Sequence, residues 1–280
     1  MKKLVISGLL LAAAISGAAA EAPLWLRNVA ISPDGSTVAF TYKGDIYTVP
    51  ATGGRARQIT TSPAYDTAPS WSPDGSRLLF ASTRDGGQKI YVIPADGGTA
   101  TVLSTGVASA RPLGWLDGET VLFVANMQPA REAAQGAFQA QVYTVSADGL
   151  TRPRMYMSLP AGAMSVDPRG RVLYQDRKGY EDPLRKHERS SGTSDIWLLE
   201  QGKYTRLTDF NGQDQNPVWA PDGQSFFYTT ELSDGTMNVH RRTLSGSDTQ
   251  ITRFADHPVR SLSASADGTL AFSWNGEIYT

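Results

Sequence analysis

Short runs of alternating apolar residues recur along the whole chain. Residues 37–42, 77–81 and 120–124 are rich in Val, Leu, Phe and Tyr, and a second run follows each after a polar turn, as at 45–49 and 89–93. Four to six residues of this composition at a period of two are typical of β-strands. Many runs are apolar on both faces, which is the pattern of sheets covered on both sides. The pattern therefore predicts pairs of antiparallel, well-buried strands.

A Pro-Asp-Gly-type turn precedes each pair of runs and occurs six times in the chain. Its best copies are Ser32-Pro33-Asp34-Gly35 and Ser72-Pro73-Asp74-Gly75, and two weaker copies centre on Asp117 and Asp167. The six aspartates are Asp34, Asp74, Asp117, Asp167, Asp222 and Asp267. Repeats of about 40 to 45 residues, each with about four strands, are typical of propeller blades. We predict an all-β fold, a six-bladed β-propeller with four-stranded antiparallel blades, and not a β-sandwich, which would lack this self-similarity.

The sixth copy reaches only its third strand, at residues 277–280. Two explanations are open. An N-terminal strand at residues 24–27 could complete the last blade, as some propellers close their ring in this way. We favour the other explanation, that the last blade is incomplete because this sequence is the N-terminal part of a longer protein.

The first twenty residues have the pattern of a secretory signal peptide. Lys2 and Lys3 precede an apolar run at 4–15 and the small residues 16–20, and the run is short for a membrane anchor. We therefore predict a signal peptide at 1–20, a propeller domain at 21–280, and a periplasmic or otherwise exported protein. No membrane span is expected after removal of the signal.

Composition narrows the classes of partner. The chain has 26 Lys and Arg against 27 Asp and Glu, so loss of Lys2 and Lys3 leaves 24 against 27, a net charge of −3. This balance argues against nucleic acid as a partner. The chain has no Cys, which excludes disulfides and thiolate metal sites.

The three histidines do not form a recognisable catalytic or metal-binding pattern. His187 lies in a charged stretch followed by Ser190 and Ser191, where a serine–histidine–acid set is conceivable but a solvated loop explains the charges better. His240 is expected as a half-exposed strand residue, and His257 as a turn or cap residue before Pro258. Their spacing does not suit zinc. We assign no catalytic, cofactor-binding or metal-binding residue within 1–280.

Two further motifs admit a simple structural interpretation. The acidic segment from Asp209 to Asp214 resembles a calcium loop but lacks its final glutamate. Asp66 and Asp214 recur before a tryptophan, so we expect them to fix the turn before each inner strand, with Trp71 and Trp219 in the core between blades. Segment 129–141, with five alanines, is predicted as a long loop or one short helix.

Several motifs together resemble exported tricorn-like serine peptidases. They are the segments 23–27 (Pro-Leu-Trp-Leu-Arg), 42–50 (Tyr-Lys-Gly-Asp-Ile-Tyr-Thr-Val-Pro), 178–187 (Lys-Gly-Tyr-Glu-Asp-Pro-Leu-Arg-Lys-His) and 257–260 (His-Pro-Val-Arg). The Ser-Pro-Asp-Gly cycle itself is also similar to the Tol-system periplasmic propeller. The tricorn resemblance implies a six-bladed propeller followed by a second, seven-bladed propeller, a PDZ domain and a serine peptidase domain that degrades oligopeptides.

The resemblance implies a non-catalytic module of such a peptidase, one that gates or positions oligopeptides. Its partners would be oligopeptides or protein and its own downstream domains, with no cofactor. The alternative is a stand-alone periplasmic propeller that binds or scaffolds proteins, as in the Tol system. A third hypothesis, that these 280 residues are themselves a hydrolase, rests only on His187 and its neighbouring serines.

Overall fold

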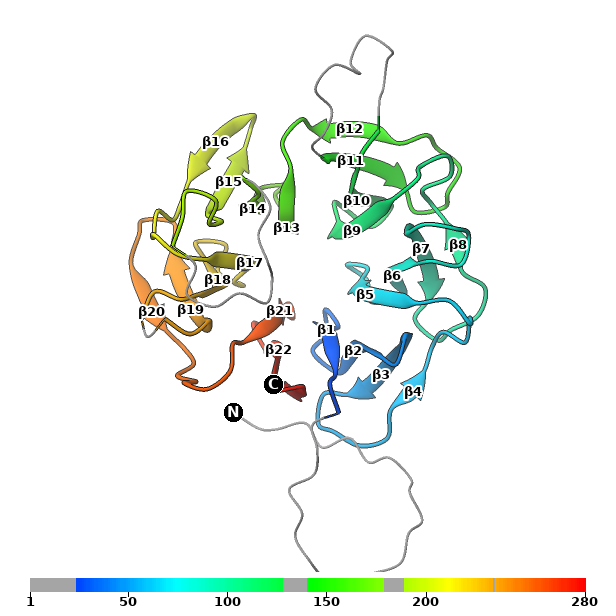
Figure 1. The fold of residues 1–280 in the computed structure, drawn as a ribbon, viewed down its shortest axis with the longest axis horizontal. Coiled ribbons are helices and arrows are strands. Elements are labelled where there is room, and N and C mark those ends of the chain that lie inside the picture. Colours follow the sequence, from blue (N-terminus) through cyan, green and yellow to red (C-terminus); the bar gives the residue numbers. More distant parts are fainter. Residues whose placement is uncertain (1–23, 128–139, 179–188, 234) are drawn as a thin grey trace, which may run out of the picture.

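Six antiparallel sheets are arranged around a central axis like the blades of a propeller (Figure 1). The structure is a computed structural model that describes residues 24–127, 140–178, 189–233 and 235–280. These residues form 23 strands and no helix, so no described segment is a helix able to cross a membrane. The predicted all-β, six-bladed architecture is confirmed. The predicted signal peptide and most of segment 129–141 lie outside the described residues.

Each of the first five blades contains four strands and the sixth contains three, in the order of the chain from the central axis outward. Blades 1 and 2 comprise β1 (Arg27–Ile31), β2 (Thr37–Tyr42), β3 (Asp45–Pro50), β4 (Arg57–Gln58), β5 (Asp66–Trp71), β6 (Arg77–Ser82), β7 (Lys89–Pro94) and β8 (Thr101–Val102). Blades 3 and 4 comprise β9 (Ala110–Trp115), β10 (Thr120–Ala125), β11 (Gln141–Ser146), β12 (Arg154–Met157), β13 (Ala161–Val166), β14 (Val172–Asp176), β15 (Ile196–Glu200) and β16 (Lys203–Arg206). Blades 5 and 6 comprise β17 (Asp214–Trp219), β18 (Ser225–Thr230), β19 (Asn238–Thr243), β20 (Asp248–Gln250), β21 (Arg260–Ala264), β22 (Leu270–Trp274) and β23 (Glu277–Tyr279).

The repeated Pro-Asp-Gly segment is a turn that joins the inner strand of a blade to its second strand. In blade 2 the Asp74 carboxylate accepts hydrogen bonds from the Ser72 hydroxyl (2.6 Å), the Ser76 backbone N–H (3.0 Å) and the Ser76 hydroxyl (2.7 Å). Gly75 has a positive φ of 73°, which glycine adopts without strain. The turn is thus fixed by local chemistry, which explains why the sequence reveals it so clearly.

We expect Asp74→Ala to lower the free energy of unfolding by about 1 kcal/mol at pH 7, the usual net value for lost hydrogen bonds. The same bonds, first that from Ser72, lower the pKa of Asp74 to about 2 from 3.8. The stabilisation is therefore present above pH 4 and fades as the pH falls towards 2. Urea denaturation at pH 7 and pH 2.5 measures both effects. Asp96→Ala is the control, because the side chain of Asp96 is exposed in a different turn and binds only Arg57 among the described residues; an equal loss there would contradict the prediction.

An aromatic pair joins the second and third strands of the blades at one equivalent position. The rings lie 5.7 to 6.4 Å apart, a distance at which aromatic pairs attract each other. The pairs are Phe40–Tyr47, Phe80–Tyr91, Phe123–Tyr143, Tyr174–Trp197, Tyr228–His240 and Phe272–Tyr279. In blade 5 a histidine takes the place of the third-strand aromatic residue.

A hydroxyl residue after the outer strand closes four of the blades. Thr60, Ser104, Thr208 and Thr252 each accept a hydrogen bond from the backbone N–H of the third strand, at 2.9 to 3.0 Å. The outer strands end directly before an Ile-Thr, Leu-Ser or Leu-Thr pair that contains this hydroxyl residue. The motif therefore marks a side-chain bond that continues the sheet, because the hydroxyl replaces a backbone carbonyl.

Tryptophans at the ends of the inner strands tie neighbouring blades together. The indole N–H groups of Trp71, Trp115 and Trp219 donate to backbone carbonyls of the preceding blade's inner strand, at 3.0 to 3.2 Å. The predicted position of Trp71 and Trp219 between blades is confirmed. Each indole thus links its own blade to the inner strand of the preceding blade through one hydrogen bond.

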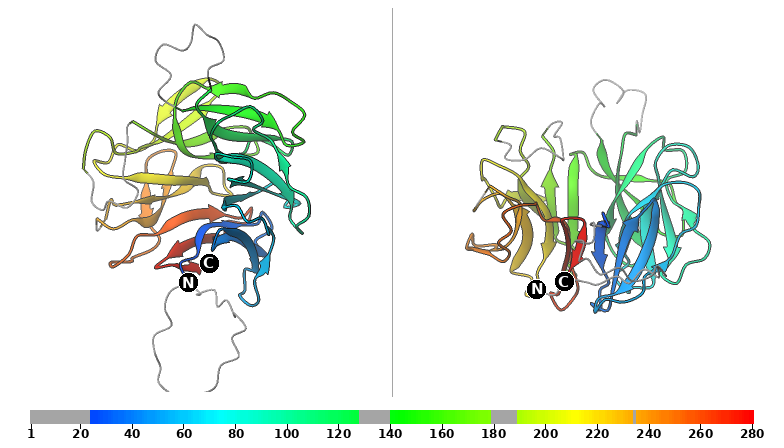
Figure 2. Two further views of the ribbon diagram at one scale, coloured as in Figure 1. Left: turned by 45° about the vertical axis from the view of Figure 1, so that its right-hand side comes forward. Right: turned by 60° about the horizontal axis from the view of Figure 1, so that its bottom comes forward.

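In the part of the chain that the structure describes, the ring closes between blades 6 and 1 without an exchanged strand. Figure 2 shows β1 beside the strands of blade 6, and β1 pairs with β2 in its own blade. The Leu26 N–H donates to the Gly276 carbonyl (2.9 Å) and the Ile31 N–H to the Ser263 hydroxyl (3.0 Å). Completion of the last blade by residues 24–27 is therefore wrong: within the described residues blade 6 has three strands, and Ala271 and Ile278 pack into the core of blade 1.

Candidate functional site

A concave cavity, which we call the central channel, lies between the inner strands of the six blades. The cavity has a volume of about 960 Å³ and opens on the side of the ring that carries the loops between second and third strands. Its wall consists of the six inner strands β1, β5, β9, β13, β17 and β21 and of residues beside them. Such a concave surface, assembled from all blades, is where a propeller can hold a ligand.

Each inner strand departs from regular pairing where it faces the channel. The register shifts in every pair of first and second strands, as between Thr67 and Ser70 in blade 2. In four blades a residue other than glycine takes a positive φ of 52° to 55° at this point: Asn28, Ala68, Asn216 and Ser261. These β-bulges line the cavity and turn the backbone towards it. Bulges place backbone groups outside the regular ladder, where they can bond to other parts of the protein or to a ligand; in blade 5 the Asn216 N–H donates to the Gln175 side chain at 3.3 Å.

Two exposed aromatic residues stand at the channel mouth. Trp25 is 63% exposed and Tyr65 is 50% exposed, and both line the cavity. Trp25 also has a positive φ of 59°, an uncommon conformation for a bulky residue. Large apolar side chains held in water beside a cavity are typical of binding surfaces.

Arginines occupy one equivalent position in three inner strands, directly before the bulge. Arg27 and Arg260, in the adjacent blades 1 and 6, are exposed and line the cavity. Arg111 in blade 3 serves a different purpose, since its guanidinium donates to the Ala161 and Gly162 carbonyls of blade 4 at 2.9 Å. Partial burial and the charge of Arg27 both lower the pKa of Arg260. The positive charges of Arg27 and Arg260 therefore repel each other.

The residue directly before this arginine position is buried in all six blades, and it is acidic in two of them. The six residues are Leu26, Asp66, Ala110, Ala161, Asp214 and Val259. Asp66 is paired, because Arg84 donates to its carboxylate at 2.7 Å. Both carboxylate oxygens of Asp214 are buried, and neither forms a hydrogen bond of ordinary geometry with a described residue. The recurrence of Asp66 and Asp214 at one position is confirmed, but their expected turn-fixing role is not observed.

The buried Asp214 carboxylate is electrostatically unfavourable. Burial raises its pKa to about 6, although the hydroxyls of Thr230 and Thr208 partly offset the effect. The negative charge of Asp195 raises the pKa further, and the positive charge of Arg242 lowers it. Burial without a full set of partners favours the neutral form of a carboxyl group. The ionised Asp214 side chain therefore lowers the stability of the folded protein at neutral pH.

His240 is buried, with 2% exposure, and the expectation of a half-exposed residue is wrong. Its Nδ1 lies 2.6 Å from Asp248 Oδ1 and its Nε2 lies 3.2 Å from the Ser233 hydroxyl. The order matches a serine–histidine–acid set, but Asp248 also accepts a hydrogen bond from the Tyr228 hydroxyl (2.6 Å), and Ser233 does not line the channel cavity. His240 fills the aromatic position that all blades share. We therefore interpret the hydrogen-bonded side chains Ser233, His240 and Asp248 as part of the core of blade 5.

The other candidates from the sequence do not converge on one site. His257 lies in the turn before β21, as predicted, where its carbonyl accepts the Trp274 indole N–H at 2.9 Å. His187 lies outside the described residues, and the described Ser190 hydroxyl accepts the Gly192 N–H at 3.1 Å. Asp209 is exposed while Asp214 is buried, so they do not form a calcium loop, and no metal-binding group of acidic or histidine side chains is found among the described residues.

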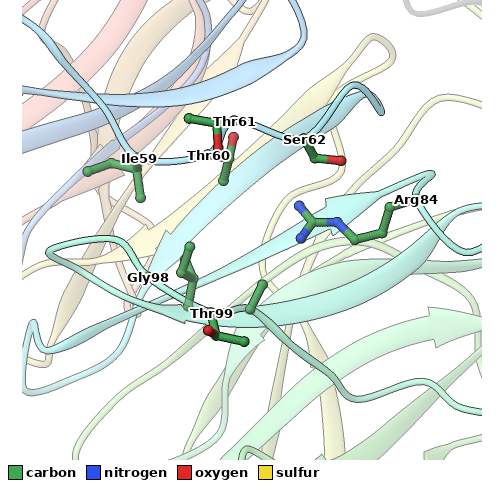
Figure 3. Close-up of a pocket in the computed structure, with 9 residues that line it drawn as sticks. Ile59, Thr60, Thr61, Ser62, Arg84, Gly98 and Thr99 are labelled. Carbon is green, nitrogen blue, oxygen red and sulfur yellow. The ribbon is translucent and has the colours of Figure 1, made fainter.

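A second, smaller pocket lies outside the channel (Figure 3). Its volume is about 330 Å³, and it is lined by the linker from Ile59 to Ser62, by Arg84 and by the turn at Gly98. The guanidinium of Arg84 is already bound to Asp66 and lies over the rings of Phe80 and Tyr91. The guanidinium of Arg84 therefore already has partners within blade 2. For this reason we take the channel as the candidate site.

Comparisons with known proteins agree with this architecture. Residues 23–280 match the family described as the tricorn protease N-terminal β-propeller domain. The chain is 27% identical over 263 residues to tricorn protease homolog 1 of Streptomyces coelicolor, which covers 92% of this chain and 24% of that relative. The chain thus spans about a quarter of that relative's length.

Solved structures share the fold. The crystal structure of the tricorn protease superposes with a TM-score of 0.72 at 22% identity, covering 92% of this chain and 25% of that one. TolB from Acinetobacter baumannii superposes with a TM-score of 0.62 at 16% identity, covering 90% of this chain and 62% of that one. At these identities the likeness concerns the fold.

Proposed function

Because the chain belongs to the tricorn protease N-terminal β-propeller family, we propose that it is the non-catalytic propeller module of an exported tricorn-like serine peptidase. Its role is to gate or position oligopeptides for a peptidase domain outside these 280 residues. The proposal of export rests on the signal-peptide pattern of residues 1–20.

The observation that carries the proposal is the channel mouth. A cavity of about 960 Å³ with bulged backbone on its wall and exposed Trp25 and Tyr65 at its rim suits an extended peptide. An extended chain needs backbone partners along its length and a few apolar contacts, and the bulged strands and the two exposed aromatic residues are the features that would supply them. No hydrolytic step is assigned to these residues, because the Ser233–His240–Asp248 chain is explained by the packing of blade 5.

Narrowing the channel tests this function. Ala163 lines the cavity on β13, so Ala163→Trp should fill part of it and lower the affinity for a fluorescent mixture of 8-to-12-residue peptides, on the order of tenfold or more. Fluorescence anisotropy measures the affinity. The control is Thr249→Trp, which adds the same side chain on exposed β20, away from the cavity.

Two outcomes would contradict the proposal. Peptides that bind equally to the chain and to Ala163→Trp would show that the channel is not used. A coding sequence downstream of residue 280 without a peptidase region would favour the alternative, a stand-alone periplasmic propeller that binds or scaffolds proteins.

A further inference from the structure

Two exposed aromatic residues occupy the same place in adjacent blades. Trp25 in blade 1 and Tyr65 in blade 2 each directly precede the position that is buried in all six blades. The inner strands that follow them lie side by side, because the Thr67 hydroxyl of β5 donates to the Asn28 side chain of β1 at 2.9 Å. The two rings are therefore neighbours along the rim of the channel.

The apolar character of this position extends over three consecutive blades. Pro258 takes it in blade 6, and Pro258, Trp25 and Tyr65 all line the cavity. In blade 4 a proline, Pro160, also takes it but does not line the cavity, and polar residues take it in blades 3 and 5. The apolar part of the rim therefore follows the arc of blades 6, 1 and 2.

The backbone holds both aromatic residues in place. The Asp66 N–H donates to the Gly44 carbonyl at 2.7 Å, and Tyr65 lies so close to Gly44 that a Cβ there would be 3.3 Å from the ring. The Leu26 N–H donates to a carbonyl of blade 6 at 2.9 Å, and Trp25 keeps a positive φ of 59° that bulky residues avoid. Uncommon backbone conformations are frequent at ligand sites, and groups fixed before binding lose little entropy when a ligand arrives.

An aromatic side chain is the ligand group that these rings match best. Burial of apolar surface favours any bulky apolar side chain, and a ring adds the attraction between aromatic groups in stacked or edge-to-face geometry. A cation could also lie over an aromatic ring. However, Arg27 lines the same cavity two residues after Trp25, and its positive charge disfavours a cationic ligand there.

We propose that the channel mouth selects oligopeptides that carry aromatic side chains, which Trp25 and Tyr65 hold. The inference rests on the proposed peptide-handling function and adds the class of peptide.

The test uses four unlabelled decapeptides with blocked ends that are identical except at two central positions, which are Phe, Leu, Ser or Lys. A fluorescent label is avoided because its own rings would compete for the site. Isothermal titration calorimetry with the 280-residue chain should show the phenylalanine peptide binding about tenfold more tightly than the serine peptide. The leucine peptide, apolar but without a ring, should bind about threefold more weakly than the phenylalanine peptide, and the lysine peptide more weakly still.

Variants of the two aromatic residues locate the preference. Trp25→Asn/Tyr65→Ser should bind the phenylalanine and serine peptides equally, and asparagine accepts the positive φ of position 25. Trp25→Phe/Tyr65→Phe, which keeps two rings, should retain the preference. The matched control is Tyr204→Ser, which removes a comparably exposed tyrosine from the outer strand β16, away from the cavity, and should also retain it.

The outcomes separate this inference from the proposed function. If the chain binds the phenylalanine and serine peptides equally and Ala163→Trp weakens both, the inference fails and the proposed function stands. The same holds if Trp25→Asn/Tyr65→Ser keeps the preference. If the chain binds none of the peptides, both fail. Equal binding of the leucine peptide, or tighter binding of the lysine peptide or of a chitin hexasaccharide, would also overturn the assignment to aromatic side chains.

Discussion

Asp214→Asn is expected to stabilise the protein at pH 7.5, by about 2 kcal/mol. The Asp214 carboxyl is 1% exposed and burial raises its pKa to about 6, from an ordinary value of 3.8. A rise of about two units corresponds to about 3 kcal/mol of destabilisation by the charged form. The uncharged amide removes this cost but remains a buried polar group, so we expect a somewhat smaller gain.

The sign of the pH dependence follows from the direction of the shift. Below about pH 4 the carboxyl is protonated in both the folded and the unfolded chain, so no penalty exists. As the pH rises from 4 to 6 the unfolded chain ionises more readily than the folded one, and stability is lost. The advantage of Asp214→Asn should therefore be absent below about pH 4 and complete above about pH 7. Urea denaturation followed by tryptophan fluorescence measures it across this range.

Blade 2 provides the matched control. Asp66 occupies the same register position as Asp214, but Arg84 binds it at 2.7 Å. Asp66→Asn should therefore destabilise the protein at pH 7.5, by about 1 to 3 kcal/mol, because it weakens a bond between charged groups. If Asp214→Asn destabilised it as well, Asp214 would have a favourable partner, contrary to the prediction.

A second variant supplies the missing partner. In blade 2, Arg84 lies two residues after Ser82, the residue that pairs with Asp66. The equivalent residue in blade 5 is Leu232, which lies two residues after Thr230, the partner of Asp214. Leu232 is partly exposed, so a longer polar side chain can be accommodated there. Leu232→Arg should stabilise the protein at pH 7.5 and should have no such effect when combined with Asp214→Asn. Non-additivity of the two substitutions is the signature of a direct pair.

The sequence revealed those parts of the fold that local chemistry determines. The turn at Asp34 and the run 37–42 carry their structure in their own residues, and β2 has the predicted bounds. The resemblance to tricorn-like peptidases, read from motifs such as 42–50, is confirmed by the family match. Residues 66–71 gave no strand signal, because Asp66, Ala68 and Pro69 have low strand propensity; their place in the sheet depends on pairing with β6.

The candidate site was less accessible to sequence reasoning. His240 stands beside Arg241 and Arg242, which suggested partial exposure. Alignment of Asn238-Val239-His240 with Asp45-Ile46-Tyr47 would have placed the histidine at the buried aromatic position. The channel mouth could not be predicted, because Trp25 and Arg260 are brought together only by the closure of the ring.

Arg171→Met is expected to cost about 3 kcal/mol of stability, the largest effect of a single substitution that we predict. The Arg171 Nε donates to the Asp167 carboxylate at 2.8 Å, and both side chains are buried. Its Nη2 donates to the Gly223 carbonyl of blade 5 at 2.6 Å, and the guanidinium lies 4.4 Å from the centre of the Trp219 ring. Methionine fills part of the space but leaves the Asp167 charge buried without its partner.

This arginine explains how a weak copy of the repeat keeps its turn. Asp167 still accepts the backbone N–H groups of Arg169 and Arg171, as the aspartates of the better copies do for their own turns, but here the carboxylate is buried and needs a counter-charge. Asp167→Asn added to Arg171→Met should therefore recover part of the loss, because the amide is uncharged. The same guanidinium also joins the turns of blades 4 and 5.

The matched control is Arg241→Met in blade 5. Arg241 also binds the aspartate of a turn, Asp222 at 2.6 Å, but both side chains are more than a third exposed. An exposed pair of this kind contributes below about 1 kcal/mol. Urea denaturation of both variants at pH 7 should therefore show a several-fold larger loss for Arg171→Met. Equal losses would mean that burial does not decide the strength of these pairs, and that the turn of blade 4 is held by its backbone alone.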